Sequence, residues 1–328
     1  MRPYIDVWKP RQPTRPVAHD EKLYIKRSQT VYEMRKLSIG SGLGIAFVLL
    51  MLLSVGSPAV AQNTSLPDSA TIDHTVPNGT LVIVGGGSTK AIHRHFVELA
   101  GGDEADVVCV PTAHPYGKMS GWCRRLFRRA RVPKDHRTYL HTRDPETADT
   151  EAFAEPLKSA DAVWFTGGRQ WRLVEAYAGT KAEAAFRDVL ERGGVIGGSS
   201  AGASIQGSFL VRGDPKTKTI VVGEYTEGFG YLPNSAIDQH VQARNREYDL
   251  IPVIEERPRL LGLGINEGTA AIVHEDTLRV MGKSNVAVYD AQRWQEGESK
   301  DERFFFLQPG NHFNLDTRTV ISKPTQEP

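Results

Sequence analysis

At Gly198-Ser199-Ser200-Ala201-Gly202 the chain reads G-x-S-x-G, directly after the apolar, glycine-rich run 193–197. This is the sequence form of a sharp turn from a buried strand into a helix, with small residues flanking a serine because larger ones would clash. Ser200 alone has glycine two places on either side, so the pattern predicts that Ser200 is an exposed nucleophile. A plain Gly/Ser loop is the alternative, since the pattern is short.

Short apolar runs and helical patterns alternate before this turn. We expect strands at 81–84, 106–110, 138–140, 160–165 and 193–197, and helices at 92–99, 122–130 and 171–192. Buried strands separated by helices predict an α/β fold with a mainly parallel sheet and helices on both faces. Small residues follow four of the strands, at the sheet edge where such folds bind ligands.

The C-terminal third has a different pattern. Short strands are expected at 270–273, 278–281, 286–289 and 303–307, and they would extend or flank the main sheet as an antiparallel addition. Because no linker interrupts this part, residues 81–328 are predicted to form a single domain, preceded by a polar linker at 62–80.

The N-terminal region resembles a targeting segment. A basic start, an apolar middle and Ala59-Val60-Ala61 predict a signal peptide at 34–61, cleaved near Ala61, and a secreted or periplasmic product. Residues 1–33 are polar and are interpreted as an over-extended gene start or a disordered extension, so Met1 and Met34 are both candidate starts. An uncleaved membrane anchor is the alternative, and only then would the protein contact a membrane.

Composition excludes several classes of function. The chain has 328 residues and a formal net charge of +1, which gives no argument for nucleic-acid binding. Its two cysteines, Cys109 and Cys123, make no disulfide framework, and Cys109 is expected in the core. No metal-ligand spacing is present, and the glycines 85–87 fit no nucleotide motif, so no metal or cofactor is expected and these glycines are read as a tight turn lining a cleft.

A serine nucleophile needs a base, and His240 is the candidate. It follows Asp238 and Gln239, precedes Arg244 and Arg246, and is expected to open a helical pattern. A solvated helix face with a core histidine is the alternative. The elbow 40 residues upstream favours the catalytic interpretation.

Three motifs together resemble a known family: Thr166-Gly167-Gly168-Arg169-Gln170, the elbow, and Asp238-Gln239-His240 with the two arginines. They are similar to the cyanophycinase branch of the dipeptidase E–like serine peptidases, peptidase family S51. The resemblance implies a sheet like that of class I glutamine amidotransferases, with Ser200 as nucleophile and His240 as base. It implies an oxyanion hole from the backbone N–H groups of Gly168 and Ala201, and it places these residues at the substrate: Gln170, Asp238, Gln239, Arg244 and Arg246.

The resemblance leaves the third catalytic residue open. The family's order is nucleophile, acid, histidine, and its glutamate lies just beyond Gly213-Asp214, where this chain has Lys216 and Lys218. The candidate acids between Ser200 and His240 are, in order of preference, Asp214, Glu224 and Glu227. Asp249 replaces a family arginine, which changes the charge offered to a substrate.

The substrate implied is cyanophycin, a polyaspartate with arginine on each side chain. Arginines suit its carboxylates, and Asp238 and Glu267 suit its guanidinium groups. The expected reaction is hydrolysis to β-Asp-Arg dipeptides through an acyl-enzyme. An aspartyl or isoaspartyl dipeptidase and a non-catalytic exported binding protein are the alternatives, whereas an amidotransferase would carry cysteine at the elbow. A homodimer is left open.

Overall fold

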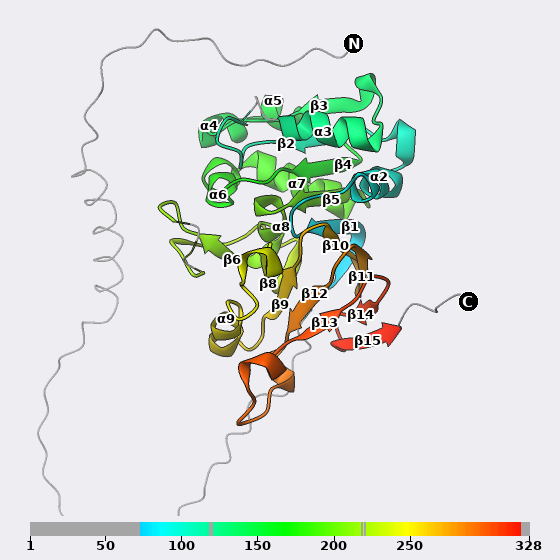
Figure 1. Cartoon of the computed structure of the whole chain (residues 1–328). Helices are drawn as coiled ribbons and strands as arrows, with labels where there is room; N and C mark the ends of the chain where they lie inside the picture. The colour runs from blue at the N-terminus through cyan, green and yellow to red at the C-terminus, as the bar shows by residue number, and fades with distance from the viewer. Residues whose placement is uncertain (1–72, 118–120, 218, 220, 323–328) are drawn as a thin grey trace, which may run out of the picture. The chain divides into compact units, whose positions relative to one another are not determined.

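The computed structural model describes residues 73–117, 121–217, 219 and 221–322. The predicted extension, the signal peptide and most of the linker lie outside these residues. The described chain forms two sheets, and the larger has the order β15-β14-β11-β10-β1-β5-β4-β2-β3 (Figure 1). Its central part is parallel and consists of β1 (Val76–Val84), β5 (Val195–Ser199), β4 (Ala162–Phe165), β2 (Val107–Val110) and β3 (Arg137–Tyr139). The first strand begins at Val76, inside the predicted linker.

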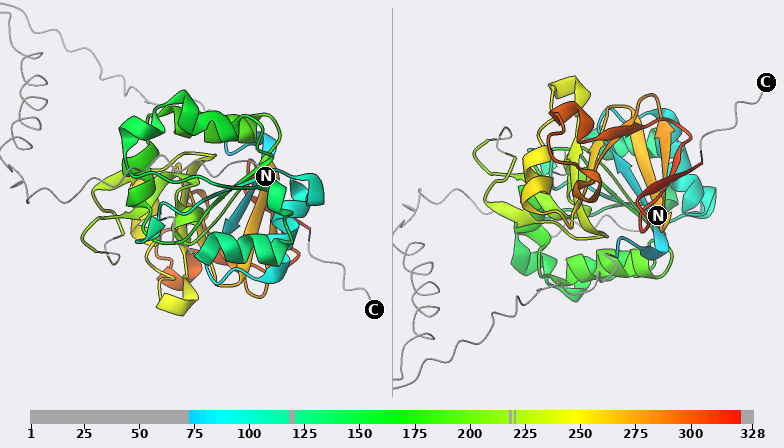
Figure 2. Two further views of the ribbon diagram at one scale, coloured as in Figure 1. Left: turned by 90° about the horizontal axis from the view of Figure 1, so that it is seen from above. Right: turned by 90° about the horizontal axis from the view of Figure 1, so that it is seen from below.

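The alternation of side chains along β1 explains why helices cover both faces of this sheet. Leu81 and Ile83 pack in one core with Phe186, and Val82 and Val84 pack in another with the opposite helical layer. Figure 2 shows these two layers on either side of the strands. One layer contains α2 (Lys90–Leu99) and α3 (Gly121–Ala130), and the other contains α4 (Pro145–Ala148), α5 (Glu151–Ala154), α6 (Trp171–Tyr177) and α7 (Lys181–Glu191). The predicted α/β class is confirmed.

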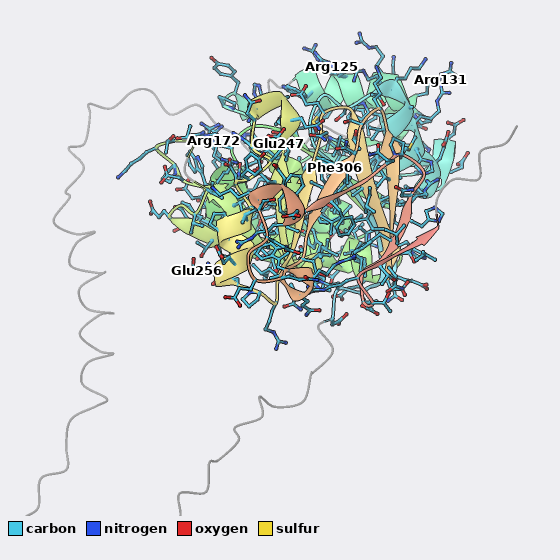
Figure 3. The ribbon with its side chains drawn as sticks, turned by 60° about the horizontal axis from the view of Figure 1, so that its bottom comes forward. Arg125, Arg131, Arg172, Glu247, Glu256 and Phe306 are labelled. Atoms are coloured by element: carbon cyan, nitrogen blue, oxygen red, sulfur yellow. A yellow bond between two sulfur atoms is a disulfide. The ribbon has the colours of Figure 1, made fainter. Side chains whose placement is uncertain are left out.

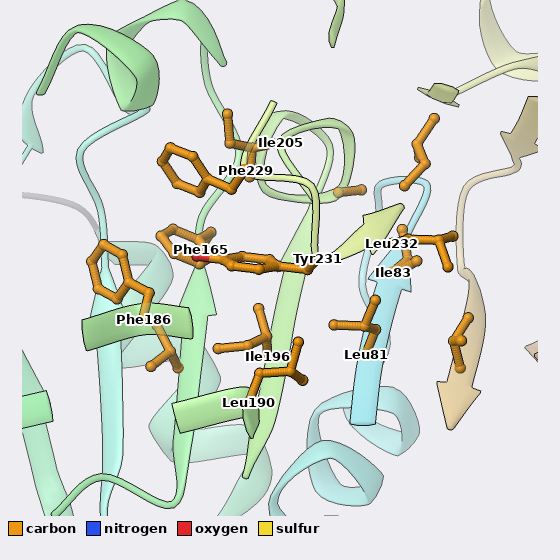
Figure 4. Close-up of a cluster of buried hydrophobic side chains, with 14 of the residues drawn as sticks. Leu81, Ile83, Phe165, Phe186, Leu190, Ile196, Ile205, Phe229, Tyr231 and Leu232 are labelled. Atoms are coloured by element: carbon orange, nitrogen blue, oxygen red, sulfur yellow. The ribbon is translucent and has the colours of Figure 1, made fainter. Parts of the chain in front are cut away.

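An aromatic cluster anchors the end of β4 (Figure 4). The ring of Phe165 lies edge-on to Phe186 at 5.0 Å between centroids and contacts Phe229 at 5.9 Å. Aromatic pairs at these separations add about 0.5–1.5 kcal/mol each beyond the area that they bury. Because Phe165 directly precedes the loop Thr166-Gly167-Gly168, this packing fixes where that loop begins.

The second sheet was not anticipated from the sequence. Its order is β13-β12-β9-β8-β6-β7, with β6, β8 and β9 parallel. His240 was expected to open a helical pattern, but it follows the end of a strand formed by residues 232–239. That strand lacks polar–apolar alternation because it is largely buried on both faces, which hid it from a periodicity argument. The members are β6 (Gly207–Gly213), β7 (Tyr225–Glu227), β8 (Leu232–Gln239), β9 (Leu261–Ile265), β12 (Val286–Tyr289) and β13 (Phe305–Leu307).

The antiparallel addition divides between the two sheets. Two of the predicted C-terminal strands extend the main sheet beside β1, and the strands predicted at 286–289 and 303–307 join the second sheet. The extension consists of β10 (Thr269–Glu275), β11 (Thr277–Gly282), β14 (His312–Asn314) and β15 (Thr319–Ser322). The remaining elements are short helices: α8 (Ala201–Ser204), α9 (Ile251–Glu256) and 3₁₀ turns at Gly102–Glu104, Lys134–His136, Glu155–Leu157, Gln242–Arg244, Ala291–Arg293 and Lys300–Glu302.

The two cysteines are joined in a disulfide that the sequence did not predict, whereas the predicted burial of Cys109 is confirmed. Cys109 on β2 and Cys123 on α3 form a disulfide with a Cα–Cα distance of 5.8 Å, and both side chains are fully buried. The bond ties α3 to the sheet. Within the part of the chain that the structure describes, no helix is long and apolar enough to cross a bilayer.

Candidate active site

The turn between β5 and α8 holds Ser200 in a conformation that its surroundings impose. Its φ of 58° and ψ of −115° are unusual for a residue with a side chain, and its N–H donates to Val84 O at 3.0 Å. A Cβ on Gly198 would lie 2.1 Å from the carbonyl oxygen of Gly202, and a Cβ on Gly202 would lie 2.1 Å from the carbonyl oxygen of Phe165, so neither position has room for a side chain. The G-x-S-x-G pattern therefore forms the predicted elbow.

Ser200 is hydrogen-bonded in series with an imidazole and a carboxylate. His240 Nε2 lies 2.9 Å from Ser200 Oγ, and His240 Nδ1 lies 2.5 Å from Glu267 Oε1. A carboxylate only accepts, so Nδ1 carries the ring hydrogen and Nε2 presents its lone pair to the serine hydroxyl. This is the arrangement in which an imidazole can take the proton of an attacking serine.

The partner of the histidine corrects the sequence prediction. Asp214 accepts the backbone N–H groups of Lys216 and Thr217 at 2.8 and 2.7 Å, so it caps a turn after β6. Glu224 and Glu227 do not pair with His240 either, among the described residues. Glu267, predicted only as a guanidinium ligand, takes this place because the turn from β9 to β10 returns the chain to the end of β1, beside His240.

The glycines 85–87 pack against His240 and Glu267. The N–H of His240 donates to Gly85 O at 2.8 Å, and the N–H of Gly268 donates to Gly86 O at 2.8 Å. A Cβ on Gly86 would lie 2.1 Å from His240 Cε1, and one on Gly87 would lie 3.5 Å from the Glu267 side chain. The loop 85–87, predicted from the sequence to be a tight turn lining a cleft, thus contacts the His240 ring and fixes its position.

Gly86→Ala is expected to lower kcat by about 100-fold, because the methyl group forces the imidazole away from Ser200 by a distance of the order of an ångström. Steady-state hydrolysis measures the loss. Gly101→Ala is the matched control: its φ of +113° resembles the +132° of Gly86, but its Cβ would meet nothing within 4 Å. Equal losses in the two variants would attribute the effect to backbone strain and contradict the prediction.

The two predicted oxyanion donors flank the serine. A Cβ on Gly167 would lie 3.3 Å from Ser200 Cβ, so the turn after β4 lies against the nucleophile. Gly168 has a φ of +150°, and a Cβ there would lie 2.0 Å from Ala113 O. In the described part of the chain, neither Gly168 nor Ala201 donates its N–H to a turn or loop carbonyl. Both groups are therefore available to a developing negative charge.

Asp238, predicted to bind substrate, is fully buried and engaged within the protein, which corrects that expectation. Its two oxygens accept from Arg212 Nε and Nη2 at 2.8 and 2.6 Å, and Arg212 also pairs with Asp249 at 2.6 Å. Arg246 is 7% exposed and donates to Gln239 O at 3.3 Å, so it too supports the strand end from within. The carboxylate that replaces a family arginine thus binds Arg212, a residue that the sequence did not single out.

The other predicted substrate residues divide by exposure. Gln170 is buried and donates its amide to Val211 O at 2.8 Å, which links the turn after β4 to β6. Gln239 Oε1 lies 3.4 Å from Ser200 Oγ and is a second acceptor for the hydroxyl. Arg244 is exposed and makes no ion pair among the described residues. Of Arg244 and Arg246, Arg244 is therefore the arginine whose side chain is accessible to a ligand.

Burial, followed by the charges of Arg244 and Arg246, lowers the pKa of His240, and the hydrogen bond that His240 donates to Glu267 opposes this. A lowered pKa keeps the imidazole neutral to a lower pH, so the acid limb of kcat/KM is expected below about pH 6.5. In Arg244→Gln, loss of the positive charge favours the imidazolium, and the limb moves to higher pH. A pH profile of both proteins tests this, and a limb that moves to lower pH in the variant contradicts it.

A serine, an imidazole and a carboxylate in a hydrogen-bonded series at an elbow are the arrangement of a serine hydrolase site. The profile described as "Peptidase family S51" matches residues 81–281. A cyanophycinase of Geminocystis herdmanii is 29% identical over 220 residues, covering 64% of this chain and 80% of that protein. One of Synechococcus elongatus is 30% identical over 229 residues, covering 67% and 70%. The chain therefore belongs to peptidase family S51 and is a serine-type peptidase.

The fold has a solved counterpart. The crystal structure of a peptidase from an acI-B1 Actinobacterium matches with a TM-score of 0.53 and 22% identity, over 74% of this chain and 98% of that one. This likeness supports the predicted sheet architecture, similar to class I glutamine amidotransferases.

Proposed function

We propose that this peptidase hydrolyses cyanophycin to β-Asp-Arg dipeptides. Ser200 attacks the scissile carbonyl while His240 takes its proton, the N–H groups of Gly168 and Ala201 hold the oxyanion, and His240 returns the proton to the leaving amine. The acyl-enzyme is then hydrolysed by the same steps with water. The observation that carries the proposal is the 2.9 and 2.5 Å hydrogen-bond series from Ser200 through His240 to Glu267, together with the cyanophycinase relatives.

The charges around the site support a substrate with carboxylates. Arg244 is exposed next to His240, close enough for its charge to lower the pKa of the imidazole. A guanidinium group binds a carboxylate in two parallel hydrogen bonds, so it fixes orientation as well as charge. Asp238 is held by Arg212, and Glu267 by His240, so recognition of the substrate's own guanidinium falls to other groups.

Incubation of purified cyanophycin with the wild-type protein tests the function, with Ser200→Ala as the control. The expected result is release of β-Asp-Arg by the wild type alone, identified by mass. Turnover of short aspartyl or isoaspartyl peptides with intact polymer would show a dipeptidase instead. No reaction with either substrate or with a serine-directed phosphonate would show a non-catalytic binding protein.

We further propose that the protein acts outside the cytoplasm, and two observations support this. The N-terminal pattern is that of a signal peptide ending near Ala61. The buried disulfide is of a kind that persists in oxidising compartments and is rare in the cytosol. The intact mass of the exported protein tests the proposal: a chain that begins at Gln62 is expected, and one that retains the apolar segment would contradict cleavage.

A further inference from the structure

A cavity of about 160 Å³ lies beside the nucleophile and is not used by the chemistry described above. Ser199 and Gly167 form part of its wall, so it lies directly next to Ser200 and to Gly168. Side chains of α2 and α3 form the opposite wall. At about 30 Å³ for each water molecule, the cavity holds the volume of roughly five waters, which suits one short side chain.

Two guanidinium groups border this cavity without a carboxylate partner. Arg125 and Arg129 lie one turn apart on α3, whose sequence Gly121–Ala130 contains four arginines and no acidic residue. Neither arginine makes an ion pair with a carboxylate among the described residues. Like charges at this spacing repel each other, and burial, with the charges of Arg125 and Arg128, lowers the pKa of Arg129. Figure 3 labels Arg125 on this helix.

Two contacts hold α3, and with it Arg125 and Arg129, in position. Arg129 donates a hydrogen bond to the carbonyl oxygen of Ser88, in the loop that continues from the glycines under His240. The disulfide from Cys123 to Cys109 joins the helix to β2. The helix that carries Arg125 and Arg129 is therefore held in a fixed position relative to the turn at Ser200.

A buried imidazole without a partner completes the wall. His93 is 5% exposed, and its Nδ1 is buried with no hydrogen-bond partner in the described structure. Its ring lies edge-on to Trp164 at 5.0 Å. Burial and the charges of Arg129 and Arg125 lower the pKa of His93 to about 3, so the imidazole is neutral and can donate one hydrogen bond.

We propose that this cavity binds a carboxylate of the substrate residue next to the scissile bond, with Arg125 and Arg129 as its cations. The inference rests on the proposed function for the identity of the substrate. Two guanidinium groups that pair with no carboxylate among the described residues attract an anion. The rings of Trp122 and Trp164, which also line the cavity, suit a methylene group, and the volume fits a carboxymethyl group. An aspartyl unit has this chemistry. The cavity would thus orient the main chain of a polyaspartate across the elbow.

Protection of Ser200 from a serine-directed phosphonate tests the subsite without use of the polymer. N-acetylaspartate is expected to slow labelling of the wild type at concentrations about 10- to 100-fold lower than N-acetylasparagine, which lacks one carboxylate. Arg125→Gln and the double variant with Arg129→Gln should lose this difference. Arg124→Gln is the matched control, because Arg124 lies on the same helix but does not line the cavity.

The outcomes separate this inference from the proposed function. Equal protection by the two compounds in the wild type, or an unchanged difference in Arg125→Gln, would overturn the subsite even if the polymer is cleaved. Loss of the difference in the Arg125 variant, with the polymer left intact by the wild type, would support the subsite and overturn the proposed function. Unprotected labelling at the wild-type rate shows that each variant is folded, and Arg125→Gln alters an exposed side chain.

Discussion

Ser200→Ala is expected to lower kcat by about 10⁶-fold, which corresponds to about 8 kcal/mol of transition-state stabilisation. The hydroxyl oxygen is the atom that forms the acyl bond, and His240 Nε2 lies 2.9 Å from it to take its proton. Substrate binding is expected to survive, because alanine occupies the same strained turn with a smaller side chain. Single-turnover hydrolysis measures the loss, and an equilibrium binding assay measures what remains.

Ser204→Ala is the matched control for this change. Ser204 lies four residues further on in α8, and its hydroxyl is buried without a hydrogen-bond partner in the described structure. Its removal deletes an unsatisfied polar group, so neither activity nor stability should fall. A phosphonate should label Ser204→Ala and not Ser200→Ala. Labelling of the Ser200 variant, or retention of its activity, would contradict the assignment of the nucleophile.

The elbow was predictable because its chemistry is local. Gly198 and Gly202 leave no room for a side chain at this turn, and their spacing around Ser200 is visible within five positions. The alternation of short apolar runs and helices is local in the same sense, and it predicted the parallel sheet and the helices on its two faces. The turn at the end of β4 followed from Gly167 and Gly168 for the same steric reason.

The roles of Glu267, Gly86 and Asp238 were not predicted, because they depend on contacts between segments that are distant in the sequence. Glu267 reaches His240 because β9 pairs with β8, and β10 pairs with β1, and neither pairing is written in the residues around Glu267. The role of Gly86 depends on an imidazole more than 150 residues away. Asp238 resembled a substrate ligand because the sequence did not reveal that Arg212 lies opposite it in the neighbouring strand.

The cysteines illustrate the same limit. Cys109 and Cys123 are separated by 14 positions, and one of them lies in an apolar run typical of a core strand. Burial was therefore predictable for Cys109. The pairing was not, because it needs α3 to pack over the end of β2, and no local pattern fixes where a helix packs on a sheet.

Glu267→Gln is expected to lower kcat by about 10³- to 10⁴-fold while KM changes little. The amide can donate to Nδ1, which favours the tautomer that carries its hydrogen on Nε2 and cannot accept the serine proton. The carboxylate also raises the pKa of His240, so its loss lowers that pKa and moves the acid limb of kcat/KM to lower pH. The Glu267 side chain is 48% exposed, and water can replace part of its role, so we expect a smaller loss than for Ser200→Ala.

Asp214→Asn distinguishes Glu267 from the acid that the sequence favoured. Asp214 accepts two backbone N–H groups in a turn after β6, so its amide variant should keep kcat within about 3-fold and lose only some stability of that loop. Only the Glu267 variant should show the shifted acid limb, because only its carboxylate contacts the imidazole. A large loss in Asp214→Asn with normal activity in Glu267→Gln would mean that the histidine changes partner in the working enzyme. Equal losses with unshifted pH profiles would reduce both carboxylates to a structural role.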